Sequence, residues 1–162
     1  MNKLSHLDTQ GKVKMIDVSD KKETERRARA SCSVLMKNDT LDLIIAGRVP
    51  KGDVLATAKI AGIMAAKKTA ELIPMCHALN VTGIDMSFKR AGDDELRIEA
   101  EVKIKGVTGV EMEVLTACSV AALTVYDMVK SVEKGVRITD LHLLEKEGGK
   151  SAKWQSGKGE VQ

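Results

Sequence analysis

The order of polar and apolar positions predicts a long helix over residues 111–134. Apolar side chains recur there every three to four residues, which is the spacing of a helix with one side in a core. Val120 and Leu123 fall on the side that carries Asp127, so the second side is partly apolar as well. We therefore expect this helix to be buried on both sides. The core-facing stripe consists of Val114, Cys118, Ala121, Ala122, Val125, Val129 and Val132.

The remaining pattern predicts strands and shorter helices. One helix is expected from the capping residues at Asn38 to Gly47, and a second from Asp53 to the residue before Pro74. Alternating or β-branched stretches predict strands at residues 28–36, 81–89, 96–105 and 136–144. The order of strand, helices, strand, strand, helix, strand is typical of a ferredoxin-like α+β fold, an antiparallel β-sheet with helices packed on one face.

With 162 residues, the chain is expected to form one domain. We expect this domain over residues 1–146, with a loosely ordered N-terminus at residues 1–20. Residues 147–162 are rich in Gly, Ser and Lys and are expected to form a flexible tail. The first residues hold no apolar signal region, and no uninterrupted apolar run approaches membrane-spanning length. A soluble, cytoplasmic protein with no membrane partner is therefore expected.

Composition narrows the possible partners. The chain has one Phe, one Tyr and one Trp, so its core must be aliphatic and platforms for stacking nucleic-acid bases are lacking. A net charge of +3 in a mixed background permits a local pocket for a small anion but does not favour nucleic acid. The three cysteines are far apart and form no CxxC pair, so neither a disulfide framework nor a metal site is expected.

Asp127 and Lys130 are the most suggestive charged residues of the long helix. They lie three residues apart and therefore share one side. They form either a surface ion pair or a general acid–base group beside a cation, and the spacing leaves both interpretations open. Lys51 is similarly ambiguous: it precedes a helix start that suits phosphate, but Asp53 there also suits an ordinary N-cap.

Other candidates have ordinary explanations beside the functional ones. Cys76 and His77 lie in a loop without nearby metal ligands, so an imidazole that binds a ligand or transfers a proton is favoured over a metal site. Lys67 shares a helix side with Lys59, which is more often a solvated surface. Glu113 suits the positive end of the helix dipole and points in a direction similar to that of Asp127, ~21 Å away. One pocket can use both acids only with a long ligand or with two subunits.

Four long blocks of the sequence are MIDVSDKKETERRARA, KGDVLATAKIAGIMAAKKTAELIPMCHAL, GVTGVEMEVLTACSVAALTVYDMVK and LLEKEGGKS. In this order they resemble the MoaC family of molybdenum cofactor biosynthesis, the cyclic pyranopterin monophosphate synthases, over most of the chain. The chain has LIPMCHAL where the family is expected to have LIPLCHPL. Ala78 in place of proline predicts a less rigid loop after His77, and Met75 keeps an apolar side chain. Neither change removes a reacting group.

The resemblance implies a reaction and an assembly. It implies a lyase that converts 3′,8-cyclo-7,8-dihydro-GTP into cyclic pyranopterin monophosphate and diphosphate, with no metal or organic cofactor. It also implies a homohexamer, a trimer of dimers, with active sites at subunit interfaces. By position, Lys51, Asp127 and Lys130 would be catalytic. The substrate-binding residues would be Met75, Cys76, His77, Met112 and Glu113, together with the basic residues Arg26, Lys67 and Lys146.

A second class of function is compatible with the same residues. A ferredoxin-like nucleotide-binding or regulatory module could use Lys51 and Lys67 to bind phosphate without catalysing a reaction. Diphosphate release from the cyclo-dihydro-GTP substrate separates the enzyme from such a module.

Overall fold

The computed structural model describes residues 10–149 and 153–157. Its strands and helices alternate along the chain much as the hydrophobic pattern predicts. In chain order they are β1 (Thr24–Leu35), α1 (Asn38–Ile45), α2 (Val54–Lys67), α3 (Thr69–Leu72), β2 (Gly83–Arg90), β3 (Glu95–Gly106), α4 (Glu111–Val129), β4 (Arg137–Glu147) and β5 (Trp154–Gln155).

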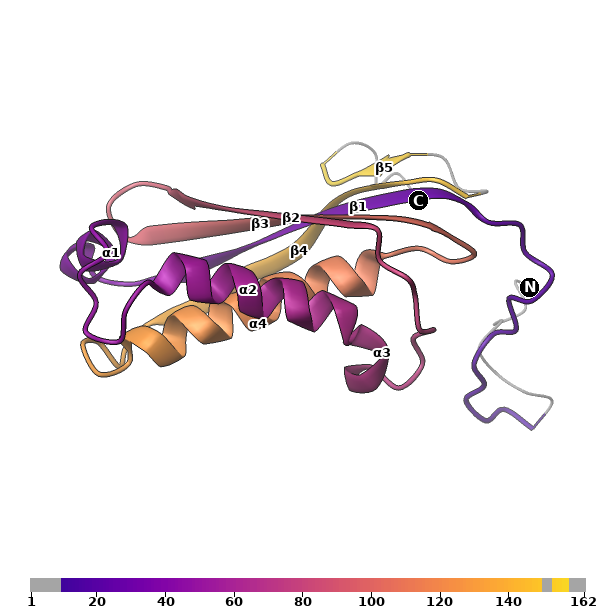
Figure 1. Ribbon diagram of the computed structural model, residues 1–162, viewed down its shortest axis with the longest axis horizontal. Helices are drawn as coiled ribbons and strands as arrows, with labels where there is room; N and C mark the ends of the chain where they lie inside the picture. Colours follow the sequence, from indigo (N-terminus) through magenta and orange to yellow (C-terminus); the bar gives the residue numbers. More distant parts are fainter. Residues whose placement is uncertain (1–9, 150–152, 158–162) are drawn as a thin grey trace.

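The strands form one antiparallel sheet in the order β2-β3-β1-β4-β5. Strand β1 lies at the centre and pairs along its length with β3, for example Ala28 with Val102. Helices α2 and α4 cover one face of the sheet side by side, with α1 and α3 near opposite ends of α2 (Figure 1). This arrangement confirms the predicted ferredoxin-like α+β fold and adds the short strand β5 at the edge beside β4.

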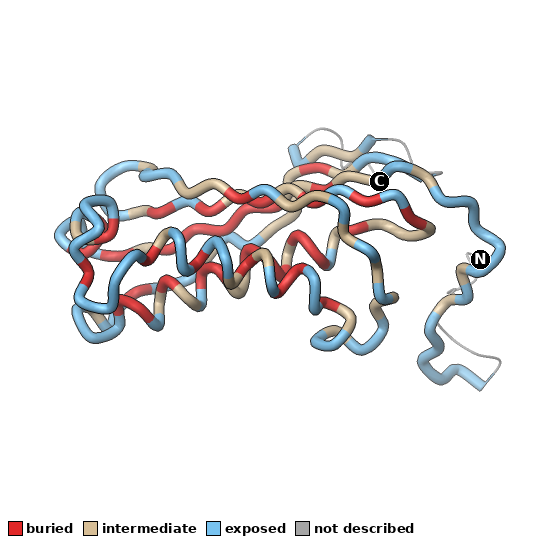
Figure 2. Tube along the Cα trace, in the orientation of Figure 1, coloured by how far each residue is buried: buried red, intermediate tan, exposed pale blue. Residues whose placement is uncertain are grey.

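The core lies between the sheet and the inner sides of α2 and α4 (Figure 2). Strand β1 turns Ala28, Ala30, Cys32 and Val34 inward, and all four are fully buried. Every second side chain of the strand thus faces the helices, and Ser31 and Ser33, which lie between them in sequence, are buried as well. The core is aliphatic, as the shortage of aromatic residues requires.

Helix α4 is long and apolar enough to cross a membrane by length and composition alone. In the structure, however, more than half of its apolar stretch is buried inside the fold, against α2 and the sheet. That is the environment of a core helix in a globular domain.

Several predicted boundaries were wrong. Helix α4 ends at Val129 rather than at residue 134, because the chain turns there to begin the antiparallel strand β4; the N–H groups of Val132 and Glu133 both bond to the Val129 carbonyl. The second predicted helix is divided at Lys68 into α2 and α3. Strand β1 begins at Thr24 rather than at residue 28, because residues 24–27 already pair with residues 103–106 of β3.

The predicted ends of the chain lie partly outside the described residues, which begin at residue 10 and omit 150–152 and 158–162. Within the segment expected as a flexible tail, Trp154 pairs with Lys146 and Gln155 with Glu145 to form β5. The backbone of the tail therefore returns along β4 for at least these two residues.

We predict that Gly62→Ala destabilises the fold. Gly62 lies where α2 crosses α4, and a Cβ there would come within 2.9 Å of the Ala117 carbonyl oxygen and 2.5 Å of the Met86 sulfur. The Met86 side chain can move, but the α4 backbone cannot without repacking. We expect the free energy of unfolding to fall by about 1–3 kcal/mol despite the higher helix propensity of alanine. Chemical denaturation measures it, and an equal or higher value would contradict this close packing.

Candidate functional site

Lys51, Asp127 and Lys130 come together at the C-terminal end of α4. The Lys130 ammonium lies 2.7 Å from Asp127 Oδ1, and the Lys51 ammonium lies 3.3 Å from Oδ2. Lys51 also donates a hydrogen bond of 2.8 Å to the Asp127 backbone carbonyl. Each carboxylate oxygen therefore has its own cation. We refer to these three residues as the Lys–Asp–Lys cluster.

The turn before α2 positions Lys51. Asp53 caps α2 by accepting a 2.9 Å hydrogen bond from the Ala56 N–H, so the ordinary N-cap role of this aspartate is present. Gly52 precedes it with φ of 103°, a conformation that favours glycine. Since α2 and α4 lie side by side with the start of α2 near the end of α4, this turn brings Lys51 to Asp127 (Figure 1).

The two lysines hold Asp127 as a carboxylate. Hydrogen bonding from Lys130, followed by that from Lys51, lowers the pKa of Asp127 below its ordinary value. Asp127 in turn raises the pKa of Lys130. The side chains are 57% exposed for Asp127, 41% for Lys51 and 52% for Lys130. Ion pairs this exposed contribute little to stability, so the fold does not depend on the cluster, and its charged groups are accessible from solvent.

The expectation that α4 is buried on both sides was wrong for the single chain. The outer side, which carries Asp127, leaves Leu123 57% exposed. The reason is that nothing in the described part of the chain covers this side of the helix layer; the sheet lies on the other side.

A second set of predicted residues meets at the opposite end of α4. The loop after α3 supplies Met75, Cys76 and His77, and the first turn of α4 supplies Met112 and Glu113. All five line one cavity of about 360 Å³, which we call the loop cavity. The structure therefore brings together residues that are more than 30 positions apart in sequence.

Glu113 is the most perturbed acid of the loop cavity. It is only 4% exposed, and burial raises its pKa, with Glu111 adding to the effect and a backbone hydrogen bond opposing it. Burial, and then the charge of Glu113, also raises the pKa of Cys76. Cys76 is therefore held as a thiol, which does not suit a thiolate nucleophile or metal ligand. In residues 10–149 and 153–157, no group of three His, Cys, Asp or Glu side chains is arranged to hold a metal.

Arg26 and Lys146 line a smaller cavity of about 200 Å³ that adjoins the loop cavity and shares Gly109 and Glu111 with it. The Lys146 ammonium lies 2.7 Å from Glu111 Oε1. Arg26 donates to the carbonyls of Gly106 and Val107 at 3.0 and 3.1 Å, which fixes its guanidinium beside the start of α4. Both predicted basic residues thus lie beside the loop cavity.

Lys67 is not brought to either cluster. It ends α2 with an exposed side chain, and none of the cavities described includes it. Lys59, on the same helix, lies 3.6 Å from Asp85 of β2 and is also exposed. The solvated-surface interpretation of these two lysines fits the structure of the single chain.

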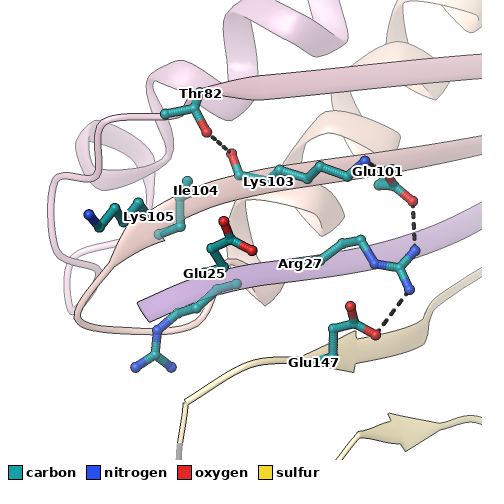
Figure 3. Close-up of a pocket in the computed structure, with 9 residues that line it drawn as sticks. Glu25, Arg27, Thr82, Glu101, Lys103, Ile104, Lys105 and Glu147 are labelled. Atoms are coloured by element: carbon teal, nitrogen blue, oxygen red, sulfur yellow. Dashed lines mark hydrogen bonds and ion pairs between the residues drawn. The ribbon is translucent and has the colours of Figure 1, made fainter. Parts of the chain in front are cut away.

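A larger cavity, about 600 Å³, lies along β1 and β3 and is lined mainly by charged side chains (Figure 3). These charges largely satisfy one another. Arg27 bonds to Glu101 at 2.9 Å and to Glu147 at 3.2 Å. Hydrogen bonds from Lys103 and then from Arg27 lower the pKa of Glu101, and the bond from Arg27 lowers the pKa of Glu147. We interpret this cavity as a structural ion-pair network rather than as the site.

The sequence did not single out several residues of the loop cavity. Besides the predicted five, its walls include Ile16, Val18 and Lys21 from the segment before β1, and Leu79 and Thr108. Ile16 and Val18 could have been found from their spacing, because they are two branched apolar residues, two positions apart, within a polar stretch.

Comparison with known proteins identifies the family. Residues 15–149 match the sequence model of the MoaC family. The chain belongs to the MoaC family. It is 53% identical over 153 residues to the cyclic pyranopterin monophosphate synthase of Listeria monocytogenes, covering 94% of this chain and 96% of the relative. It is also 53% identical over 155 residues to the protein of that name from Chloroflexus aurantiacus, covering 95% of each chain.

We predict that Glu113→Gln stabilises this MoaC-family chain at neutral pH. Burial raises the pKa of Glu113 in the folded state, so the folded chain loses stability as the pH rises through that pKa, and glutamine removes the loss. The melting temperature of the variant should exceed that of the wild type at about pH 7.5, and the difference should shrink towards about pH 3, which lies below the unfolded-state pKa, so that the carboxyl is protonated in both states. A difference independent of pH would rule out this origin.

Proposed function

We propose that this protein converts 3′,8-cyclo-7,8-dihydro-GTP into cyclic pyranopterin monophosphate and diphosphate, as a lyase of molybdenum cofactor biosynthesis. The observation that carries the proposal is the Lys–Asp–Lys cluster in a chain of the MoaC family. The names of its relatives support the same reaction.

The chemistry of the cluster suits this reaction. Opening the purine ring and closing the pyrazine ring require several proton transfers, and Asp127 is kept by its two lysines in the ionised form that accepts a proton. Forming the cyclic phosphate breaks the bond to the diphosphate leaving group, whose developing charge Lys51 and Lys130 can stabilise. Both lysine side chains are partly exposed and therefore open to a ligand.

The loop cavity suits the heterocyclic end of the substrate. Its apolar walls can enclose a flat ring, and the nearly buried carboxyl group of Glu113 can accept hydrogen bonds from ring and amino N–H groups. Such bonds would favour the ionised form of Glu113 and offset the cost of its burial. Arg26 and Lys146, in the adjoining cavity, supply positive charge for the rest of the ligand.

The separation of the two clusters supports an assembly. Glu113 and Asp127 lie fourteen residues apart on one helix, ~21 Å along its axis. Between them the outer side of the helix layer exposes Ile60, Met64 and Leu123. A second copy related by a two-fold axis can cover these residues and bring its loop cavity to the Lys–Asp–Lys cluster. We propose a cytoplasmic homohexamer, a trimer of dimers, with such composite active sites.

Asp127→Asn and Lys51→Ala are each expected to lower kcat by at least about 100-fold, because one removes the base and the other a cation beside it. Melting temperatures should stay close to that of the wild type, since both side chains are exposed. Diphosphate and pterin formation are followed together in single-turnover reactions. Lys59→Ala is the matched control, an exposed lysine paired with Asp85 away from the cluster.

The same assay separates the enzyme from a binding module. Near-wild-type turnover in Asp127→Asn or Lys51→Ala would remove that residue from the mechanism. Wild-type protein that binds GTP and the cyclo-dihydro-GTP substrate without releasing diphosphate would instead be a nucleotide-binding module.

Composite sites predict that two inactive variants restore each other's activity. Asp127→Asn is defective in one cluster and Glu113→Gln in the other. The two variants are co-expressed with different tags, and assemblies that carry both tags are purified. A two-fold dimer of unlike chains contains one intact site and one doubly defective site. If chains pair at random within the assemblies, about half of the dimers are unlike, so about a quarter of all sites recover. Mass in solution is measured in parallel. Mixed assemblies as inactive as the parents, or a monomeric mass, would show that each chain builds its own site.

A further inference from the structure

The segment before β1 forms one wall of the loop cavity. In residues 10–23 the side chains are exposed except for those of Ile16 and Val18, which are half-buried. Both line the loop cavity, together with Lys21. We call residues 16–21 the N-terminal strap.

A hydrogen bond ties the strap to His77. The His77 Nε2 atom lies 2.8 Å from the carbonyl oxygen of Ile16. A carbonyl oxygen only accepts, so Nε2 carries the proton in this contact. In the neutral ring the proton on Nε2 leaves Nδ1 as an acceptor. The strap thus decides which nitrogen of His77 can receive a hydrogen bond or a proton.

A compact turn holds the strap in shape. Asp17 Oδ1 accepts hydrogen bonds from the Ser19 N–H at 2.9 Å and the Ser19 hydroxyl at 2.6 Å, and these bonds lower the pKa of Asp17. The Lys21 N–H then bonds to the Val18 carbonyl at 3.0 Å. The turn carries the chain back so that Val18 and Lys21 both reach the cavity.

Lys21 supplies a charge that the loop cavity otherwise lacks. Among the described residues that line it, Lys21 is the one lysine or arginine, whereas Glu111 and Glu113 are acids. Glu111 is already paired with Lys146. The cation available to a ligand in this cavity is therefore that of Lys21.

We propose that the N-terminal strap is part of the substrate site, an inference that rests on the function proposed above. Lys21 binds an oxygen of the nucleotide-derived substrate in the loop cavity. The Ile16 carbonyl is a positioning group, which keeps His77 in the form protonated on Nε2 with Nδ1 free to accept. The strap therefore contributes binding through Lys21 and directs proton transfer through His77.

The binding half is tested with Lys21→Ala and its matched control Lys22→Ala, the next lysine along the chain and not part of the cavity wall. Lys21→Ala should raise the KM for the cyclo-dihydro-GTP substrate by about tenfold or more. It should raise the Kd of GTP, measured by calorimetry, by a similar factor, because the variant loses a hydrogen bond from a charged donor. Its kcat should change little, and Lys22→Ala should match the wild type in all three. Equal behaviour of the two variants would overturn the role of Lys21.

The positioning half is tested by NMR of the imidazole nitrogens, whose ¹⁵N shifts distinguish the two neutral tautomers. Wild-type His77 should be protonated on Nε2 alone. Asp17→Ala opens the turn and should give a mixture of tautomers, and Asp17→Asn, which keeps the Oδ1 acceptor, should restore the wild-type spectrum. A wild-type His77 protonated on Nδ1, or an unchanged Asp17→Ala spectrum, would refute the positioning role.

These readouts also separate the strap from the proposed function. If the wild-type protein releases no diphosphate, the proposed reaction is refuted. GTP affinity and the His77 spectrum would still decide whether the strap completes a ligand site.

Discussion

The packing of α2 against α4 is the constraint on which the site depends. Gly62 lets the two helices approach so closely that any larger residue would meet the Ala117 carbonyl. Because the helices lie side by side in opposite directions, the turn that precedes α2 meets the end of α4, and the loop that follows α3 meets its start. The close packing of these two helices therefore sets the positions of both clusters, which lie ~21 Å apart along α4.

The open face of the sheet and the outer side of the helices differ in how their side chains are paired. On the open face of the sheet, Arg27 and Arg29 pair with acids on β3 and β4, and this network satisfies its own charges. On the outer side of the helices, apolar residues such as Ile60 and Leu123 remain exposed beside charged ones. The first surface is complete in one chain, whereas the second is the kind of surface that association covers.

The sequence predicts the fold well because its signals are periodic. Inward alanines on β1 and the apolar stripe of α4 determine which sides face the core, and the antiparallel order follows. The end of α4 was missed because its stripe continues to Val132 beyond the point where the chain must turn. Spacing along a helix suggested Asp127 and Lys130, and the turn before a helix suggested Lys51 as a phosphate ligand, but no spacing in the sequence showed that Lys51 meets Asp127. The strap was missed because its contact with His77 spans 61 residues and uses a backbone carbonyl.

The exposure of the Lys–Asp–Lys cluster has a consequence for its surroundings. At physiological ionic strength, dissolved ions screen exposed charges over about 8 Å, so in an isolated chain these lysines act on a distant phosphate only weakly. A surface that covers the cluster removes those ions together with the water. The same three side chains then act through a medium of lower permittivity, and their field on a bound substrate grows although no distance among them changes.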